Sequence, residues 1–438
     1  MDTGDTAFVL VSAALVMFMT PGLALFYGGM VRAKNVLGTL MQSVFALGLV
    51  SVLWVLIGYT LAFGPDKGGL IGGLDFLGLR GVGADPNPDL AGTIPHTTFA
   101  LFQMMFAVIT PALITGAFAE RMKFSAYALF TAVWLLLVYA PVAHWVWAPG
   151  GWIREMGALD FAGGTVVHIN AGVAALAAAV IIGRRRGFGK QAVVPHNLTM
   201  TLLGTGILWF GWFGFNAGSA LGANGLASSA FLATHLGAAA GACGWALYEA
   251  TRERRPTTLG VASGAVAGLV AITPAAGFVS PLPAIAIGLC AGIVCAVAVR
   301  LKFRFGLDDS LDVVGVHLAG GIVGALLTGV FADLAVNGAG ADGLLNGGGA
   351  ALLGKQVVAV GATFAFSLAV SAAILKIVDL TVGLRVSSEE EASGLDLSQH
   401  AEVGYAFSES GGAIEREPER DVPAPSPVAA VPVPSDAR

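Results

Sequence analysis

Two histidines lie in the middle of long apolar runs, where an ionisable side chain is costly to keep. His168 lies in the run 163–170 and His317 in the run 313–320, and both are flanked by small or apolar residues. A histidine inside a lipid-embedded helix indicates a functional site by default. Two neutral imidazoles in contact share one hydrogen bond, with one ring donating and the other accepting. The pair therefore predicts a site for hydrogen bonding or proton transfer, and two separate packing histidines are the alternative interpretation.

An aspartate precedes each of these histidines. Asp160 stands eight residues before His168, and Asp312 stands five residues before His317. On a helix these separations correspond to about 80° and about 140° of rotation, so direct contact with the imidazoles is not expected. We expect both carboxylates to accept backbone N–H groups at a helix N-terminus. Asp160 would also favour cations on its side of the membrane, and Asp312 would act as a structural cap.

Aromatic residues form a second pattern. Phe102 and Phe106 are one helical turn apart, Phe215 and Ser219 share a helix face, and Trp147 ends an apolar run. Aromatic ring faces attract a small cation, and a hydroxyl group adds a directional acceptor. Each aromatic residue alone is typical of an interface anchor or a core filler. Together they predict a cation site at one mouth of a membrane path.

The composition defines the elements that must position these residues. Charged residues make up 12% of the 438 residues and apolar residues 56%. So few charges cannot cover a soluble fold of this size, which excludes a nucleic-acid binder, a secreted disulfide scaffold and a disordered chain. We expect an all-α polytopic membrane protein with the lipid bilayer as its solvent. The cysteines have no metal-ligand spacing, and no nucleophile–base motif or phosphate loop stands out, so we predict no enzyme, metal or cofactor.

Eleven apolar runs are long enough to cross a bilayer as helices. They lie near residues 8–31, 37–63, 97–118, 124–147, 161–183, 196–218, 226–248, 257–277, 279–300, 312–334 and 350–380. The two histidines fall in the fifth and tenth runs, which favours two five-helix halves of opposite orientation followed by a final helix. Such a 5+5 inverted repeat places a functional site near the membrane midplane.

Loop charges predict the orientation and the domains. Alternate loops, starting after the first run, carry 14 Lys and Arg residues, whereas the other loops carry four. The N-terminus is therefore expected outside and the C-terminus in the cytoplasm. We expect a transmembrane domain over 1–388 and a cytoplasmic C-terminal region over 389–410. A Pro-rich, disordered extension would follow over 411–438.

Several motifs in a fixed order carry a family resemblance that runs from about residue 5 to about residue 407. They are Met19 to Val31, Phe102 to Phe106, Ala117 to Arg121, Asp160 to Asn170, Phe213 to Ser219 and Asp308 to His317. The chain resembles the ammonium transporter family (Amt/Mep/Rh), on the bacterial Amt side. The resemblance implies a homotrimer in the cytoplasmic (inner) membrane, with one pore in each protomer and no cofactor.

The resemblance also implies roles for the residues singled out above. Ammonium recruitment would use Trp147, Phe106 and Ser219, with Phe102 beside them and Asp160 in support. Phe106 and Phe215 would form a gate at the pore mouth, and His168 and His317 would line the pore.

The tail, with Asp396, His400 and Tyr405, looks like the family's regulatory region, which helps to bind a PII-family signal protein that plugs the pores. In this chain Gln399 and Ala401 stand where the family pattern has Glu and Gly.

These expectations combine into a transport hypothesis. Ammonium, or its analogue methylammonium, would be recruited outside, lose a proton near the gate and pass as ammonia along the histidines. An ammonium sensor (transceptor) that relays occupancy to a cytoplasmic partner is the alternative from another class. A carrier for a larger organic solute is a third, because the glycines of the sixth run, Gly204, Gly206, Gly211 and Gly214, allow a broken helix.

Overall fold

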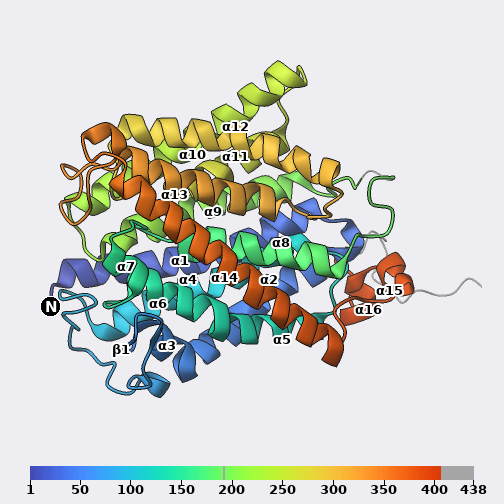
Figure 1. Cartoon of the computed structure of the whole chain (residues 1–438). Coiled ribbons are helices and arrows are strands. Elements are labelled where there is room, and N and C mark those ends of the chain that lie inside the picture. The colour runs from blue at the N-terminus through green and yellow to red at the C-terminus, as the bar shows by residue number, and fades with distance from the viewer. Residues whose placement is uncertain (191–192, 406–438) are drawn as a thin grey trace, which may run out of the picture. The chain divides into compact units, whose positions relative to one another are not determined.

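Long apolar helices make up almost the whole of the structure, a computed structural model that describes residues 1–190 and 193–405 (Figure 1). Ten helical stretches in these residues are long and apolar enough to cross a membrane. They are Thr3–Met30, Ala33–Phe63, His96–Phe118, Phe124–Met156, Gly164–Ile182, Leu198–Ala220, Gly225–Arg252, Pro281–Phe305, Val314–Phe331 and Ala351–Thr381. The remaining predicted run is the shorter apolar helix Thr258–Ile272. The prediction of an all-α polytopic membrane protein is confirmed.

Within the described residues the elements follow one another as a chain of helices with a single small hairpin. The first half contains α1 (Thr3–Met30), η1 (Ala33–Asn35), α2 (Val36–Leu53), η2 (Trp54–Gly58), α3 (Tyr59–Phe63), β1 (Asp66–Lys67), β2 (Ile71–Gly72), η3 (Leu77–Leu79), α4 (His96–Phe118), α5 (Phe124–Trp134), η4 (Leu135–Tyr139), α6 (Ala140–Trp147), α7 (Trp152–Met156), η5 (Gly164–Ile169) and α8 (Asn170–Ile182). The second half contains α9 (Leu198–Ala217), η6 (Gly218–Ala220), α10 (Gly225–Arg252), α11 (Thr258–Ile272), α12 (Pro281–Phe305), η7 (Val314–Leu318), α13 (Ala319–Phe331), η8 (Leu344–Asn346), α14 (Ala351–Thr381), α15 (Ser388–Ser393) and α16 (Leu395–His400). Strands β1 and β2 pair antiparallel.

Glycines let the helices of the second half pack closely. A methyl group added at Gly268 of α11 would lie 2.2 Å from the backbone oxygen of Gly237 in α10. One added at Gly292 of α12 would lie 2.2 Å from the oxygen of Gly241, also in α10. Side chains at these positions would force the helices apart, and close approach is what stabilises helix pairs in lipid. The glycines inside apolar runs therefore hold α10, α11 and α12 together.

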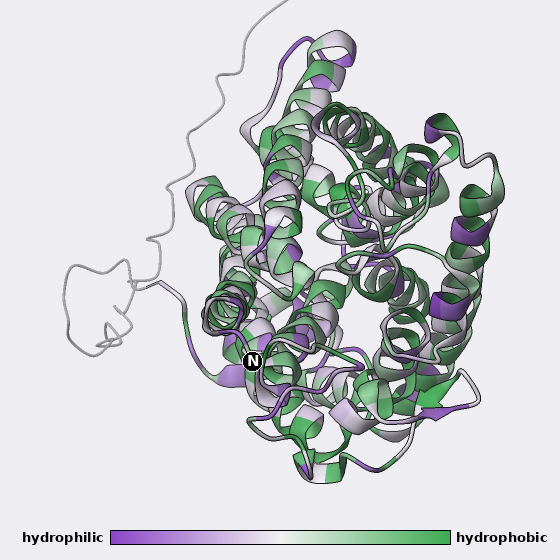
Figure 2. Ribbon diagram, turned by 90° about the vertical axis from the view of Figure 1, so that its left-hand side faces the viewer, coloured by the Kyte–Doolittle hydropathy of each residue, from purple (hydrophilic) through white to green (hydrophobic). Residues whose placement is uncertain are grey.

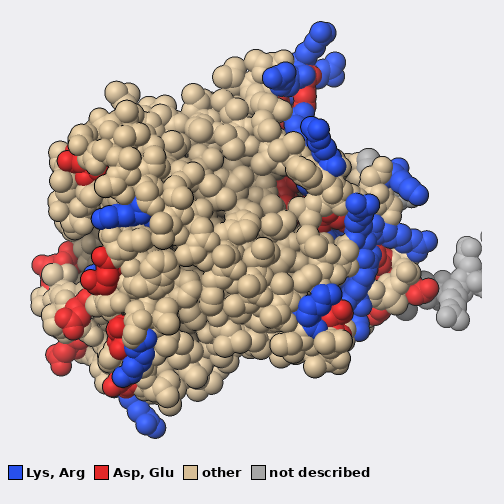
Figure 3. Space-filling model, viewed as in Figure 1, with Lys and Arg blue, Asp and Glu red and all other residues tan. Residues whose placement is uncertain are grey.

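Charged residues lie at the two ends of the bundle (Figure 3). The view shows Lys and Arg concentrated at the end that carries α15 and α16, and Asp and Glu at both ends. Seen from the end that carries the N-terminus, most of the helical ribbon is apolar or neutral (Figure 2). The broad surface between the ends has the apolar character that a membrane requires.

A network of charged side chains lies at the end of the bundle that carries α15 and α16. The Glu120 carboxylate accepts from the guanidinium groups of Arg32 at 2.8 Å and Arg185 at 3.2 Å. Arg185 also donates to Asp308 at 2.7 Å. Burial alone would raise the pKa of Glu120, but the hydrogen bond from Arg32 and the charge of Arg185 outweigh it and hold this pKa below its usual value. The carboxylate of Asp308 has its pKa lowered by Arg185 in the same way, against the effect of burial.

Helix α16 docks beside this network, because Asn35 donates to Glu120 and accepts from the backbone N–H of Leu395. The Asp396 carboxylate accepts from the backbone N–H groups of Leu37 at 3.0 Å and Gly38 at 2.8 Å, so the tail caps the first turn of α2. His400 packs edge-on against the ring of Phe124, with centroids 5.2 Å apart. Ala401, which replaces an expected glycine, ends α16 with a φ of 56°. The predicted region 389–410 is described as far as Tyr405, which is half-buried, and the extension 411–438 lies outside the described residues.

Candidate functional site

The two histidines of the apolar runs contact each other in the centre of the protein. Their Nδ1 atoms are 3.3 Å apart, and both side chains are buried. One Nδ1 must donate to the other, so one neutral ring carries its single N–H on Nδ1 and the other ring carries it on Nε2. The far nitrogens then present one acceptor and one donor. The Nε2 atom of His168 is buried and has no partner among the described residues.

Both histidines lie in π-helical turns. His168 lies in η5 and His317 in η7, and each turn continues directly into an α-helix, α8 or α13. Such turns are rare and occur frequently at functional sites. The two segments cross at glycines, because a methyl group added at Gly172 would lie 2.5 Å from the backbone nitrogen of Leu318. This close crossing brings the imidazoles into contact.

Aspartates anchor both segments, but the second one is not the residue predicted. Asp160 accepts from four backbone N–H groups at 2.7–3.2 Å, those of Gly163, Gly164, Thr165 and Val166. In the second segment Asp309 has this role, accepting from Val313 at 3.1 Å and Val314 at 2.8 Å. The prediction that Asp312 caps this helix is wrong. Asp312 has a φ of 65° and pairs with Lys302 instead.

The two histidine-bearing segments share the spacing between carboxylate and histidine. Asp309 precedes His317 by eight residues, the same spacing that separates Asp160 from His168. Each carboxylate binds the free N–H groups where its histidine-bearing helix starts. Asp312 has a left-handed backbone conformation, whereas a side chain that caps a helix normally stands on an extended residue, and its carboxylate pairs with Lys302.

The predicted aromatic site surrounds a cavity of about 170 Å³ at the end of the helical bundle that carries the N-terminus. Phe106, Trp147 and Ser219 line it, together with Phe63, Leu90, Phe99, Gln103, Arg154, Phe161 and Leu221. The rings of Phe106 and Trp147 meet at 87° with centroids 5.8 Å apart. Phe102 is fully buried behind Phe106, with centroids 4.9 Å apart, and is not part of the lining.

Two hydrogen bonds fix polar groups at this cavity. The Ser219 hydroxyl donates to the Phe215 backbone oxygen at 2.8 Å, which leaves its lone pairs free to accept from a ligand. The Trp147 indole N–H donates to the backbone oxygen of Asp160 at 3.0 Å and so fixes the ring. The same aspartate thus anchors the helix of His168 through its carboxylate and orients Trp147 through its carbonyl.

A closed pair of rings separates this cavity from the histidines. The centroids of Phe106 and Phe215 are 4.2 Å apart with the rings tilted by 32°. Phe215 in turn lies 6.1 Å from the His168 ring, and Trp212 stacks on the same imidazole at 5.4 Å. A solute moving inward from the cavity would meet these groups in that order.

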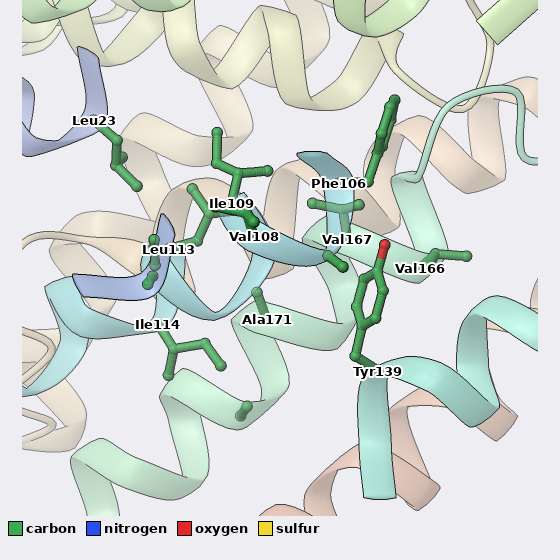
Figure 4. Packing of buried hydrophobic residues seen from close by; sticks show 14 of the residues in the cluster. Leu23, Phe106, Val108, Ile109, Leu113, Ile114, Tyr139, Val166, Val167 and Ala171 are labelled. Carbon is green, nitrogen blue, oxygen red and sulfur yellow. The ribbon is translucent and has the colours of Figure 1, made fainter. Parts of the chain in front are cut away.

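Beyond the rings lies a narrow apolar cavity of about 10 Å³ beside His168 and His317. Leu23, Ile109 and Leu113 are among the side chains that line it, and they follow Phe106 through the core in Figure 4. This volume is at the lower limit for holding one water molecule. The path beside the imidazoles is therefore narrow, and its walls offer few polar groups.

Sequence reasoning missed four residues of this site. The anchor of the second segment is Asp309 and not Asp312. Trp212 lies three residues before Phe215, and this helical spacing could have indicated that it shares the same face. Gln103 lines the outer cavity, and its side-chain oxygen is buried without a partner in the described part of the chain. Arg154 lines the cavity from α7, and no periodic pattern in its loop indicates this.

A bundle of apolar helices that encloses a narrow path between an aromatic cavity and a buried histidine pair defines a multi-pass membrane transport protein. The chain belongs to the ammonium transporter family, because the sequence model of the Ammonium Transporter Family matches residues 7–405. Ammonium transport and a membrane location follow from this membership.

Relatives support the assignment across nearly the whole chain. The chain is 55% identical to an ammonium transporter of Bacillus subtilis, over 93% of this chain and 100% of that protein. It is 48% identical to ammonium transporter Amt1 of Archaeoglobus fulgidus, over 92% of this chain and 100% of the relative. The crystal structure of Saccharomyces cerevisiae Mep2 matches with a TM-score of 0.83 at 36% identity, over 89% of this chain and 91% of Mep2. A structure titled Sensor Amt Protein also matches, with a TM-score of 0.83 at 29% identity, over 91% of this chain and 98% of that chain.

Proposed function

We propose that this protein takes up ammonium selectively across the cytoplasmic (inner) membrane in three steps. Ammonium is recruited in the aromatic cavity, transfers a proton to water in that cavity next to the gate of Phe106 and Phe215, and passes as ammonia along His168 and His317. The observation that carries this proposal is the 3.3 Å contact between the two imidazoles in a narrow path directly beyond the ring pair. Transport by this route needs no cofactor and assigns no catalytic residue.

Recruitment rests on the aromatic cavity and its hydroxyl. Trp147 and Phe106 offer ring faces on two walls, and the Ser219 oxygen offers an acceptor on a third. A small cation over such faces gains about 0.5–2 kcal/mol for each favourable contact. Phe102 supports the recruiting ring from behind, and Asp160 supports it through Trp147.

Selectivity against potassium follows from chemistry, because ammonium and potassium are nearly the same size. An intact ion pays many kcal/mol to lose its water in an apolar path. Ammonium can avoid this cost by releasing a proton, whereas potassium cannot. Ammonia both donates and accepts hydrogen bonds, and the far nitrogens of the imidazole pair provide one acceptor and one donor. The pair is therefore matched to the neutral molecule.

The arrangement in the membrane belongs to the same proposal. We count α11 as a crossing, which makes eleven, with the N-terminus outside and the C-terminus in the cytoplasm. The excess of Lys and Arg in alternate loops supports this orientation. The equal spacing of Asp160 from His168 and of Asp309 from His317 supports an inverted repeat of five plus five helices, followed by α14.

Family membership is the basis for proposing assembly and regulation. The protein would form a homotrimer in the bilayer, with a transmembrane domain over 1–388 and a regulatory region over 389–410. A PII-family protein would bind at the cytoplasmic face. Asp396 and His400 contribute to this region by docking it, through the first turn of α2 and through Phe124.

The test is transport by the full-length protein in liposomes. Currents and internal pH are recorded after ammonium, methylammonium and potassium jumps. We expect a response to ammonium and methylammonium and none to potassium. His168→Ala and His317→Ala should each lower the ammonium response at least about tenfold or admit potassium, because the pore loses a hydrogen-bonding partner. His235→Ala is the matched control, since His235 is an exposed histidine on α10.

Two results would contradict the proposal. Unchanged ammonium flux with unchanged potassium exclusion in both histidine variants would remove the role of the pair. If the unmodified protein gives no current and no rise in internal pH, that result would favour the sensor alternative. Growth of a transporter-null host on limiting ammonium then decides between a sensor and a transporter.

A further inference from the structure

One cation lines the outer cavity. Arg154 is the only ionisable side chain among the described residues around it, and the other nine are aromatic, aliphatic, amide or hydroxyl residues. We propose that the Arg154 guanidinium is a specificity-determining group that weakens cation binding in the outer cavity by direct charge repulsion. The inference rests on the proposed recruitment site and adds the residue that sets its apparent affinity.

The backbone of the recruitment site holds this charge in place. Arg154 lies on the short helix α7, and its Nη1 donates to the backbone oxygen of Trp147. The indole of the same Trp147 forms one wall of the cavity. The guanidinium is therefore not free to swing away from the mouth without losing a hydrogen bond.

The charge of Arg154 is also uncompensated. No ion pair joins it to a carboxylate within 4.0 Å in residues 1–190 and 193–405, although Arg32, Arg185, Arg300 and Arg385 each have one. Its neighbour Glu155 is directed to the backbone N–H of Gly150 instead. Asp160 is occupied by four backbone N–H groups. A cation entering the cavity therefore meets a positive charge that no described carboxylate pairs with, screened only by the solvent that reaches this exposed side chain.

Repulsion of this kind has a predictable size. Two unit charges several ångströms apart at a solvated mouth change a binding constant by about three- to tenfold. The effect depends on charge and not on shape, so ammonium and methylammonium are affected equally, whereas a divalent cation is repelled twice as strongly. Added salt weakens the repulsion because the site opens to solvent.

The arrangement balances attraction against release. The ring faces of Trp147 and Phe106 and the Ser219 oxygen attract the cation, and Arg154 limits how tightly it is held. A substrate that is bound too tightly at the first site moves on slowly, because uniform tight binding adds nothing to the later step. Arg154 thus tunes the cavity for passage of the cation and disfavours divalent competitors.

The experiment is a charge series at one position in the full-length protein in liposomes. Arg154→Lys keeps the charge, Arg154→Gln removes it but keeps a donor for the Trp147 oxygen, and Arg154→Glu reverses it. Arg80→Gln is the matched control, because Arg80 is an exposed arginine of another loop that does not line the cavity. Half-saturating concentrations for ammonium and methylammonium transport are measured at about 10 mM and about 300 mM NaCl.

At low salt we expect Arg154→Gln to lower the half-saturating concentration about three- to tenfold, by the same factor for both substrates. Arg154→Glu should lower it further, while Arg154→Lys and Arg80→Gln stay near the unmodified value. The difference should shrink toward none at high salt.

Equal half-saturating concentrations across the charge series would overturn the inference. So would a larger change for methylammonium than for ammonium, because that pattern indicates a steric role. If Arg154→Gln does not fold, Arg154→Glu and Arg154→Lys still decide the question. Absence of any ammonium response in the unmodified protein would instead overturn the proposed function itself.

Discussion

The two histidine-bearing segments have the same local structure but lie in different surroundings. Each has a carboxylate eight residues before the histidine, a π-helical turn around the histidine and an α-helix after it. Around the first segment the neighbours are aromatic, and Trp147 bonds to the carbonyl of Asp160. Around the second they are ionic, because Lys302 donates to the carbonyl of Asp309 and pairs with Asp312.

This difference separates what the two segments have in common from what is special to each. The shared carboxylate positions the imidazole by ordering the start of its helix. The surroundings give each end of the path its own character, since ring faces attract a passing cation and fixed ion pairs hold the backbone rigid. Variants at matched positions of the two segments therefore test whether the shared carboxylate or the different surroundings determine how each segment behaves.

The largest effect is expected from removing the first carboxylate. Asp160→Ala leaves four backbone N–H groups without their acceptor, whereas Asp309→Ala leaves two. We expect a loss of about 4 kcal/mol in unfolding free energy for Asp160→Ala and about 2 kcal/mol for Asp309→Ala, with ammonium transport abolished in the first. Thermal unfolding in detergent and liposome transport check both values. Asn at each position is the control, because its amide oxygen keeps one acceptor. Equal losses of unfolding free energy in the two Ala variants would show that the number of N–H bonds does not matter.

A smaller effect is expected at the wall of the cavity. Trp147→Phe removes the indole N–H that bonds to Asp160 and reduces the ring face, so the half-saturating ammonium concentration should rise about fivefold. Trp145→Phe is matched to it, because Trp145 also loses an indole hydrogen bond, to Leu70 at 2.7 Å, but does not line the cavity. Titration of transport rates against ammonium measures both. A similar rise in the Trp145 variant would trace the effect to general loosening.

The smallest effect is expected in the pH dependence of stability, through the network of Glu120 and Asp308 at the α15–α16 end. The pKa values of Glu120 and Asp308 are lowered in the folded protein. Their contribution to stability is therefore complete above the unfolded carboxyl values of about 4 and is lost as the pH falls through the lower folded values. We expect constant unfolding temperatures between about pH 7 and pH 5 and a decline below about pH 4.

Glu120→Gln should remove part of that decline, by about 1–2 kcal/mol, whereas the exposed Glu155→Gln at the other end should not. Thermal unfolding across the pH series measures the difference. A Glu120 variant whose stability falls with acid as steeply as that of the unmodified protein would assign the acid sensitivity to other carboxylates.

The sequence predicts the parts of this protein whose cost or preference in lipid follows from the residue types. His168, His317 and the apolar runs are of this kind, and so is the aromatic set of Phe106, Trp147 and Ser219. The identity of the second anchor was not predictable in the same way. Asp308, Asp309 and Asp312 crowd one loop, and which of them caps depends on where the helix starts.

Long-range contacts account for the other failures. Arg154 reaches the cavity because its loop folds back on the oxygen of Trp147, and residue types alone do not indicate such a fold. The docking of α16 depends on an acceptor for the first turn of α2, which only the assembled bundle provides.

The docked tail has a consequence for the making of the protein. Asp396 and Leu395 bond to residues 358–360 positions earlier in the chain, at the entrance to α2. Helix α2 is synthesised long before α16, so its opening turn receives these partners only after the helices between them have been made. The first turn of α2 therefore depends for two of its hydrogen bonds on a segment that is made much later.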